Sequence, residues 1–379
     1  MKAIKVGLVG AGWMGRVHAA AFANAAHTFG DDPAVLQISA VADVDRDAAE
    51  QLSRRFGAAR WSNDWRTLVD DPDIAVIDIT APNDVHPEIA LAAIAAGKHV
   101  YCEKPMANTL AEARAMKEAA ERTGISTLVG FNYLCNPIQA FAKRLIEQGK
   151  VGEIFHFRGT FDNDYMLDPT FPFTWRTDAR VGGRAGALGD MGSHVLSLAH
   201  YLVGEITEVS ASRRILHRHR HDANDIAREV ENDDLSHFIC SFPNGATGYI
   251  EASRIGTGRK LYLSYEIQGT KGALYFNQER MNELQFYRVN DDPAERGYKT
   301  VHIAPEHRDY KAFFGLAGNP IGYNDLKIIE ARRLIETVTG VESWIADFHF
   351  GYKVDRVVAA ALAAAEQHRW VTVFEFDAP

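Results

Sequence analysis

The sequence predicts an α/β fold followed by an α+β region: a doubly wound parallel sheet, then a large, mostly antiparallel open sheet with helices. Three observations predict it. Apolar runs alternate with helix-forming segments up to about residue 130, strand-like runs follow one another closely after residue 150, and a G-x-G-x-x-G turn follows the first run. We therefore expect two domains, residues 1–130 and 131–379.

Five apolar runs in the first domain predict strands buried on both faces, because their β-branched residues do not alternate with polar ones. They are IKVGLVG, LQISAVAD, IAVIDIT, KHVYC and STLVGF. Helix-forming segments lie at 13–26, around 48–56, in PEIALAAIAAG and at 110–123, and glycines follow the last two. This alternation predicts parallel strands joined by helices.

The second domain has a different order of predicted elements. After a helical segment at 138–148, strand-like runs arrive close together: EIFHFRGTF, EITEVSASRRIL, LSHFICSF, ATGYIEASR, KLYLSYEIQG, GALYFN and ELQFYRV. Several of these runs alternate, and FPNGATG and GTKGA have the composition of hairpin turns. Helical segments at about 324–339 and 352–367 close the chain.

Composition excludes several classes of function. The formal net charge is −9 with acids and bases interspersed, which argues against a nucleic-acid or anionic-membrane surface. The three cysteines are scattered without ligand spacing, so we expect neither a disulfide framework nor a metal site. There is no apolar stretch long enough to cross a bilayer and no signal-peptide pattern, so we expect a cytoplasmic protein.

The stretch GLVGAGWMG places Gly10, Gly12 and Gly15 in the spacing of a dinucleotide-binding turn. The first glycine permits the tight turn, the second lets the backbone approach a pyrophosphate, and the third lets the helix pack on the strand. The pattern alone is weak and also fits an ordinary strand–turn–helix. Its position between a strand and a helix favours nucleotide binding.

Asp43 ends the second predicted strand, where a carboxylate accepts hydrogen bonds from the hydroxyls of an adenosine ribose. A carboxylate there repels a 2′-phosphate, so NAD is favoured over NADP. Arg46 is the opposing signal, since a nearby arginine pairs with that phosphate. The alternative for Asp43 is a simple helix or turn cap.

Two strand ends, TAPNDVH and CEKP, are expected at the nicotinamide end of such a cofactor, because ligands bind outside the carboxyl ends of the strands. Pro82 and Asn83 would line the nicotinamide ribose. Lys104 would present its ammonium beside the reacting carbon and stabilise developing oxyanion charge. The alternative for Lys104 is a surface lysine paired with a neighbouring acid.

Alcohol oxidation also requires a base, and histidine is the natural choice near neutral pH. In GGRAGALGDMGSHV, Asp190 and His194 are four residues apart and share one face of a predicted helix. Either the pair acts on a substrate, or Asp190 caps the helix and His194 is an ordinary buried histidine. Spacing alone leaves these two interpretations equal.

Other polar groups are less specific. Trp175 and Arg176 either wall a polar pocket or pack on the sheet, and FDNDYMLDP has the composition of a hydroxyl-binding loop. The HRHRH stretch at 217–221 suggests a metal site at first sight. We interpret it as a solvated surface, because its histidines lie in a cationic run with no acid before Asp222.

Together GLVGAGWMG, TAPNDVH, GKHVYCEKP and GALGDMGSHVLSLAHYLVG resemble the glucose–fructose oxidoreductase/inositol dehydrogenase/MocA family, in order over nearly the whole chain. The closest likeness is to inositol and levoglucosan dehydrogenases. The resemblance implies a Rossmann domain, an open-sheet second domain, and Lys104, Asp190 and His194 as the catalytic set. It also implies a homodimer or homotetramer formed through the C-terminal sheet.

The resemblance implies two binding sets. NAD would contact Gly10, Gly12, Trp13, Met14, Gly15, Asp43, Arg46, Thr80, Pro82, Asn83, His86, Glu103, Lys104 and Arg176. Substrate would contact Lys104, Asn132, Tyr133, Asp164, Tyr165, Trp175, Asp190 and His194. Leu134, Cys135 and Arg184 depart from the family pattern near the expected substrate pocket, which leaves the particular polyol open.

We therefore expect an NAD-dependent dehydrogenase that oxidises a ring hydroxyl of a cyclic polyol or pyranose sugar. One alternative is a redox-neutral glycosidase of the same family that retains its NAD. The other is a non-catalytic nucleotide-binding sensor, which would need none of Lys104, Asp190 and His194.

Overall fold

The computed structural model describes residues 2–341 and 343–377 of the 379-residue chain. The chain divides into two compact units, Met1–Cys135 with Ile321–Tyr352, and Asn136–Pro320 with Lys353–Pro379. The domain boundary expected after residue 130 stays a prediction. The compact units place residues 321–352, which the sequence assigned to the second domain, with the first.

The first unit holds a parallel sheet in which, counting described residues, six strands follow the order β3-β2-β1-β4-β5-β6. This is the doubly wound order expected for dinucleotide binding, so the prediction is confirmed. The strands are β1 (Lys2–Val9), β2 (Ala34–Ala42), β3 (Arg60–Ser62), β4 (Val76–Ile79), β5 (His99–Cys102) and β6 (Thr127–Val129).

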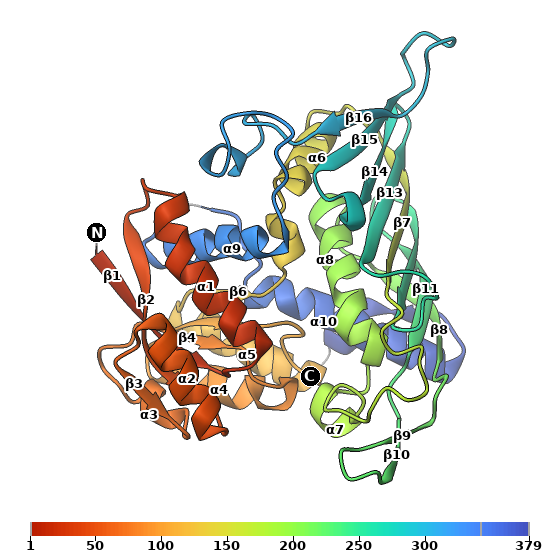
Figure 1. Cartoon of the computed structure of the whole chain (residues 1–379). Helices are drawn as coiled ribbons and strands as arrows, with labels where there is room; N and C mark the ends of the chain where they lie inside the picture. Colours follow the sequence, from red (N-terminus) through yellow and green to blue (C-terminus); the bar gives the residue numbers. More distant parts are fainter. Residues whose placement is uncertain (1, 342, 378–379) are drawn as a thin grey trace. The chain divides into compact units, whose positions relative to one another are not determined.

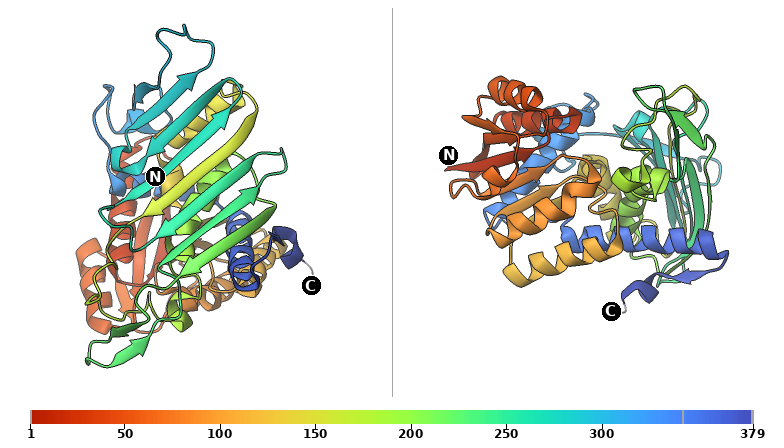
Figure 2. Two further views of the ribbon diagram at one scale, coloured as in Figure 1. Left: turned by 90° about the vertical axis from the view of Figure 1, so that its right-hand side faces the viewer. Right: turned by 90° about the horizontal axis from the view of Figure 1, so that it is seen from below.

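Helices cover this sheet on both faces, which is why its strands are continuously apolar (Figure 2). Packed on one face are α1 (Trp13–Thr28) and α2 (Arg46–Phe56), and on the other α4 (His86–Ala95) and α5 (Leu110–Thr123). The short α3 (Arg66–Val69) lies beside β1, and α9 (Tyr323–Val338) packs along α1. Val6, Leu8 and Val76 are fully buried between these layers.

The second unit is built on a sheet of nine strands in the part of the chain that the structure describes, in the order β16-β15-β14-β13-β7-β12-β11-β8-β17. Its neighbours are antiparallel except β7 and β12. The strands are β7 (Ile154–Asp162), β8 (Glu208–Arg214), β11 (Leu235–Ser241), β12 (Thr247–Ser253), β13 (Tyr262–Gly269), β14 (Gly272–Asn277), β15 (Glu283–Arg288), β16 (Lys299–His302) and β17 (Val371–Thr372).

One face of this sheet packs against α6 (Pro137–Glu147) and α8 (Ser193–Leu202) (Figure 1). Strand β11 shows the consequence, since Phe238 is buried whereas its neighbour Ile239 is 47% exposed. The hairpin turns expected in FPNGATG and GTKGA join β11 to β12 and β13 to β14.

A small separate hairpin pairs β9 (His219–His221) with β10 (Ala227–Glu229). The remaining helices are α7 (Ala179–Gly182) and α10 (Phe348–Gln367), which crosses the division between the units. Among the described residues, no helix is long and apolar enough to cross a membrane.

Candidate active site

The glycine turn between β1 and α1 has the geometry that its spacing predicts. Gly10 has a φ of 105°, and a Cβ there would lie 2.7 Å from the backbone nitrogen of Ala81. At Gly15 a Cβ would lie 2.0 Å from the carbonyl oxygen of Gly10. Both positions therefore require glycine so that the turn can pack on its neighbours.

Gly12 differs from both, because a Cβ built there would meet no protein atom within 4 Å. It is the N-cap of α1 and makes no side-chain cap hydrogen bond. An open position at the N-terminus of a 16-residue helix suits a pyrophosphate, since the N–H groups of the first turn face an anion. The residues therefore fit the phosphates of a dinucleotide.

The carboxylate of Asp43 lies beside this turn. It accepts hydrogen bonds from the backbone N–H of Ala11 at 2.6 Å and of Asp45 at 2.9 Å. The N-cap of α2 is Asp45, so Asp43 does not cap that helix. The hydrogen bond from Asp45, two residues on, is that of a turn cap, so this part of the alternative describes Asp43 correctly and is compatible with ribose binding. The guanidinium of Arg46 stacks over the ring of Trp61 at 5.2 Å.

The loops after β4 and β5 are tied to the glycine turn and to each other. The Thr80 hydroxyl donates to the carbonyl oxygen of Gly10 at 2.8 Å. The ring nitrogens of His86 lie 2.9 Å from Ala81 O and 3.0 Å from Pro105 O. Burial lowers the pKa of His86, and a neutral imidazole donates to only one of these carbonyls. The tautomer with its proton on Nδ1 donates to Pro105 O and joins the two loops, whereas the other tautomer donates to Ala81 O within the first loop.

Behind Lys104 lies a buried cluster of charges that the sequence did not predict. Glu103 is 7% exposed, and its Oε1 accepts from Lys327 Nζ at 2.5 Å and lies 3.0 Å from His18 Nε2. Its Oε2 accepts from the backbone N–H of Lys104 at 3.1 Å. Burial favours the neutral acid, but Lys327 and His18 outweigh it and hold the pKa of Glu103 well below its usual range.

The cluster extends across the sheet. Lys327 also contacts Glu330 at 2.7 Å and the hydroxyl of Tyr101 at 3.1 Å, and Tyr101 donates to Glu330. On the far side, His18 Nδ1 lies 2.9 Å from Asp78. Helix α9 therefore anchors the backbone of the E-K-P turn through Glu103, with Lys104 itself half-buried.

Asn132 and Tyr133 lie in a short 3₁₀ turn after β6 and are buried. The ring of Tyr133 packs edge-on against Tyr323 with centroids 6.0 Å apart. Trp13 also stacks on Tyr323, with ring centroids 5.9 Å apart and 56% of its own surface exposed. Tyr323, which the sequence did not identify, therefore connects two of the predicted binding residues.

In the second unit, Asp190 lies in a π-helical turn, Leu188–Gly192, that leads directly into α8. Such turns are rare and often occur at functional sites. Neither this turn nor α8 has Asp190 as its N-cap, so the capping interpretation is wrong. His194 follows in the first turn of α8, is 4% exposed and lies against the ring of Phe161.

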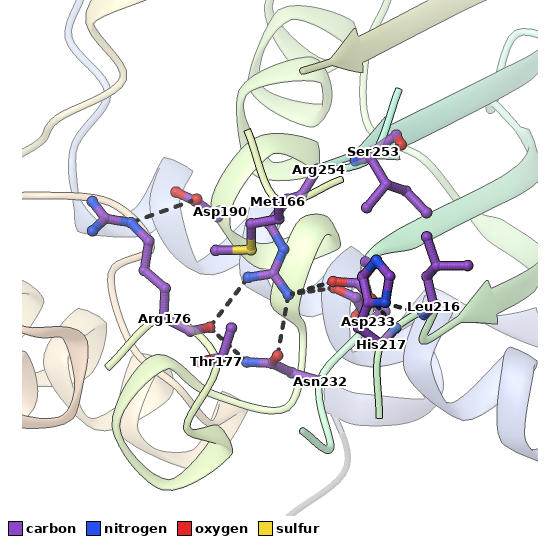
Figure 3. A network of polar contacts seen from close by, with 12 residues as sticks. Met166, Arg176, Thr177, Asp190, Leu216, His217, Asn232, Asp233, Ser253 and Arg254 are labelled. Atoms are coloured by element: carbon purple, nitrogen blue, oxygen red, sulfur yellow. Dashed lines mark hydrogen bonds and ion pairs between the residues drawn. The ribbon is translucent and has the colours of Figure 1, made fainter. Parts of the chain in front are cut away.

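Asp190 receives two polar neighbours from the loop after β7, of which Figure 3 labels Arg176. The hydroxyl of Tyr165 donates to it at 3.4 Å, and Nε of Arg176 lies 4.0 Å away. Arg176 itself stacks over Trp175 at 4.3 Å. The side chain of Asp190 remains 29% exposed, so this polar cluster is open to a hydroxylated ligand.

Other predicted positions are engaged elsewhere. Asp164 accepts a 2.8 Å hydrogen bond from Lys260, which lowers the pKa of Asp164. Arg184 pairs with Glu366 at 2.7 Å on the surface. The interpretation of 217–221 as solvated surface is wrong for Arg220, which is 2% exposed, although His219 and His221 are exposed.

Comparison with known proteins identifies the family. Residues 4–131 match the oxidoreductase family with an NAD-binding Rossmann fold, and residues 140–275 match the GFO/IDH/MocA C-terminal domain. Levoglucosan dehydrogenase of Pseudarthrobacter phenanthrenivorans is 38% identical over 100% of both chains.

Two solved structures agree. Levoglucosan dehydrogenase in complex with NADH and levoglucosan superposes with a TM-score of 0.95 at 39% identity, covering 98% of this chain and 100% of that one. An NAD-binding oxidoreductase from Klebsiella pneumoniae gives 0.93 at 44% identity, covering 98% and 99%. The chain belongs to the GFO/IDH/MocA family of NAD-dependent oxidoreductases.

Proposed function

We propose that this chain oxidises a ring hydroxyl of a pyranose-type sugar or cyclic polyol with NAD, and that levoglucosan is the first substrate to test. The observation that carries the proposal is the part-exposed cluster of Asp190, Tyr165 and Arg176, a hydroxyl-binding set. It occurs in a chain that is similar over its full length to a levoglucosan dehydrogenase.

In this proposal bound NAD supplies the hydride acceptor. Lys104 stabilises the negative charge that develops on the substrate oxygen, and His194 takes the hydroxyl proton. Asp190 orients the substrate. The remaining cofactor and substrate sets expected from the sequence stay proposals, with Gly12 and Asp43 supported most directly by their geometry.

The test is formation of NADH, followed by absorbance, with NAD and a panel of levoglucosan, myo-inositol, scyllo-inositol, glucose, xylose and galactose. NADP is run in parallel, and we expect weaker use of it because Asp43 repels a 2′-phosphate. Lys104→Ala should lower kcat by at least about a hundredfold while NAD still binds. Near-normal turnover of Lys104→Ala would refute the mechanism.

The two alternatives predict other outcomes. A redox-neutral glycosidase would release an aglycone without net NADH, and a sensor would bind nucleotide without turnover. Neither is favoured, because levoglucosan dehydrogenase matches along the whole chain and scyllo-inositol 2-dehydrogenase of Bacillus subtilis matches along 63% of it.

A homodimer or homotetramer through the C-terminal sheet and a cytoplasmic location remain proposals. Exposed apolar side chains on the sheet, Phe155 at 50% and Ile239 at 47%, favour the first. Light scattering of the purified chain would measure its mass, and a monomer would rule the oligomer out.

A further inference from the structure

The loop of residues 163–178, which joins β7 to α7, carries the side chains that meet Asp190. Tyr165 stands near its start, and Trp175 and Arg176 near its end. Over these residues, all of which the structure describes, the backbone forms neither helix nor strand. Separate backbone hydrogen bonds tie the start of the loop to the end of β12, for example from Met166 N–H to Arg254 O at 3.0 Å, but no regular ladder runs along the loop. Side chains therefore share in holding Tyr165 and Arg176 in place.

Arg220 does this for the first half of the loop. Its Nη2 donates to the carbonyl of Met166 at 2.7 Å, and its Nη1 donates to those of Asp168 at 3.1 Å and Phe171 at 3.0 Å. The guanidinium also lies over the ring of Phe171, which packs edge-on against Tyr165. The fork geometry of arginine allows one side chain to fix three carbonyls at once.

The rest of the stretch 217–221 contacts the same loop. His217 Nε2 lies 2.9 Å from the carbonyl oxygen of Leu167, so the tautomer with a proton on Nε2 donates to it. The backbone N–H of Phe173 donates to the carbonyl of His221 at 2.7 Å. The HRHRH stretch is therefore attached to the loop along much of its length.

Arg254 holds the other end of the loop (Figure 3). Its Nη1 donates to the carbonyl of Arg176 at 3.1 Å, and Asn232 donates to the same oxygen at 2.8 Å. Its Nη2 donates to the carbonyl of Asp233, whose carboxylate accepts from the backbone N–H of Leu188 at 3.0 Å. One buried cluster thus fixes both Arg176 and the turn that carries Asp190.

We infer that Arg220, with His217 and the backbone of His221, is a positioning element of the sugar site: it holds the loop so that Tyr165 meets Asp190. The inference rests on the proposed function only where it is tested by sugar oxidation. It assigns a role to a stretch that neither metal binding nor cofactor binding explains.

The test compares Arg220→Met and Arg220→Lys with the exposed neighbour Arg218→Met as control. We expect kcat/KM for levoglucosan to fall about 10- to 100-fold in Arg220→Met and less in Arg220→Lys, with the Kd for NAD within about twofold of the original protein. Arg218→Met should match the original protein. If Arg220→Met does not fold, Arg220→Lys decides, because one ammonium cannot replace the two nitrogens that bond Met166 and Phe171.

A double-mutant cycle with Tyr165→Phe separates positioning from general stability. If Arg220 acts through Tyr165 and Asp190, its substitution should cost at least threefold less in kcat/KM when the hydroxyl is already absent. Full additivity, or equal losses of NAD binding and sugar turnover, would overturn the inference.

Hydrogen exchange provides a readout that needs no substrate. Arg220→Met or Arg220→Lys should speed amide exchange in residues 163–178 without speeding it in residues 2–102. Unchanged exchange in 163–178 would refute the inference even if no sugar on the panel were oxidised, whereas absence of turnover in the original protein alone would refute only the proposed function.

Discussion

The two units bury charge next to their predicted catalytic residues in different ways. Behind Lys104, carboxylates meet a lysine and a histidine: Glu103 and Glu330 contact Lys327, and Asp78 contacts His18. Around Asp190, the buried cations Arg220 and Arg254 are bonded mainly to backbone carbonyls, although Arg254 also lies 3.7 Å from the buried carboxylate of Asp234.

Because their partners differ, the two clusters respond differently to pH. Carboxylates and histidine change protonation, so the first cluster depends on pH, and removal of one member leaves another charge uncompensated. Guanidinium stays charged at any accessible pH, and carbonyls do not titrate. The first cluster holds a turn that follows β5, a strand paired on both sides, and the second holds a loop that has no regular ladder of backbone hydrogen bonds.

The largest expected effect comes from Lys327→Met, which removes the cation between Glu103 and Glu330. We expect the free energy of unfolding to fall by about 3–5 kcal/mol, because two buried carboxylates lose their partner. Thermal unfolding measures this. Lys353→Met is the control, since its pair with Glu205 is 27% and 34% exposed and should contribute no more than about 1 kcal/mol. If both variants lost the same free energy of unfolding, burial would not explain the contribution of the ion pairs.

Glycines that border the clusters give the next effect. A Cβ at Gly186 would lie 2.3 Å from the carbonyl of Asp233 and 2.5 Å from Arg254 Nη2, and one at Gly130 would lie 2.7 Å from Glu103 Oε1. We expect Gly186→Ala and Gly130→Ala each to cost about 1–3 kcal/mol. Gly186→Ala should in addition lower kcat/KM for sugar, because it displaces Arg254.

Gly12→Ala is the matched control for these two variants, since its Cβ meets no protein atom within 4 Å. Its unfolding midpoint should stay unchanged while its affinity for NAD falls, because the methyl group enters the space assigned to the pyrophosphate. A destabilised Gly12→Ala with normal NAD affinity would contradict that assignment.

Local signals explain how much of the fold was predictable. The helix expected at 110–123 has those bounds in the structure because Thr109 and Glu112 form a capping box and Gly124 ends it in a left-handed conformation. Strands β3, β9, β10, β16 and β17 were missed because so few residues carry no measurable periodicity.

In the candidate site, too, contiguous motifs were predictable and contacts between distant residues were not. The glycine turn and the E-K-P turn are contiguous, so sequence alone indicated them. Lys327 lies 224 residues from Glu103, and Arg220 lies 54 from Met166. Nothing local distinguishes a lysine or arginine that will be buried from one that will be solvated, which is why the HRHRH stretch was assigned to the surface.

A smaller effect tests the pH dependence of the first cluster. Burial and the charge of Lys327 both lower the pKa of His18. The carboxylates of Asp78 and Glu103 raise it by more, so the pKa lies above its ordinary value of 6.5. The stabilisation by charged His18 is therefore complete below pH 6.5 and is lost as the pH rises through the raised pKa.

The measurement follows from that sign. The difference in unfolding free energy between the original protein and His18→Gln should be larger at pH 6 than at pH 9. The same difference for Arg220→Met should not change with pH, because the guanidinium, its carbonyl partners and the introduced methionine do not titrate. A pH-dependent loss in Arg220→Met would remove the distinction between the two clusters.

The smallest effect is expected from an arginine outside both clusters. Arg184 departs from the family pattern near the expected sugar pocket, yet its side chain is 67% exposed and pairs with Glu366, which Arg213 also approaches at 3.5 Å. Since Arg213 remains to neutralise Glu366, Arg184→Ala should change stability by less than about 0.5 kcal/mol and leave kcat/KM for every sugar on the panel within about twofold. If Arg184→Ala changed the ranking of the sugars by kcat/KM, Arg184 would be a specificity residue. The difference between Arg184 and Arg220 would then lie in whether the side chain reaches the substrate, and burial would not explain it.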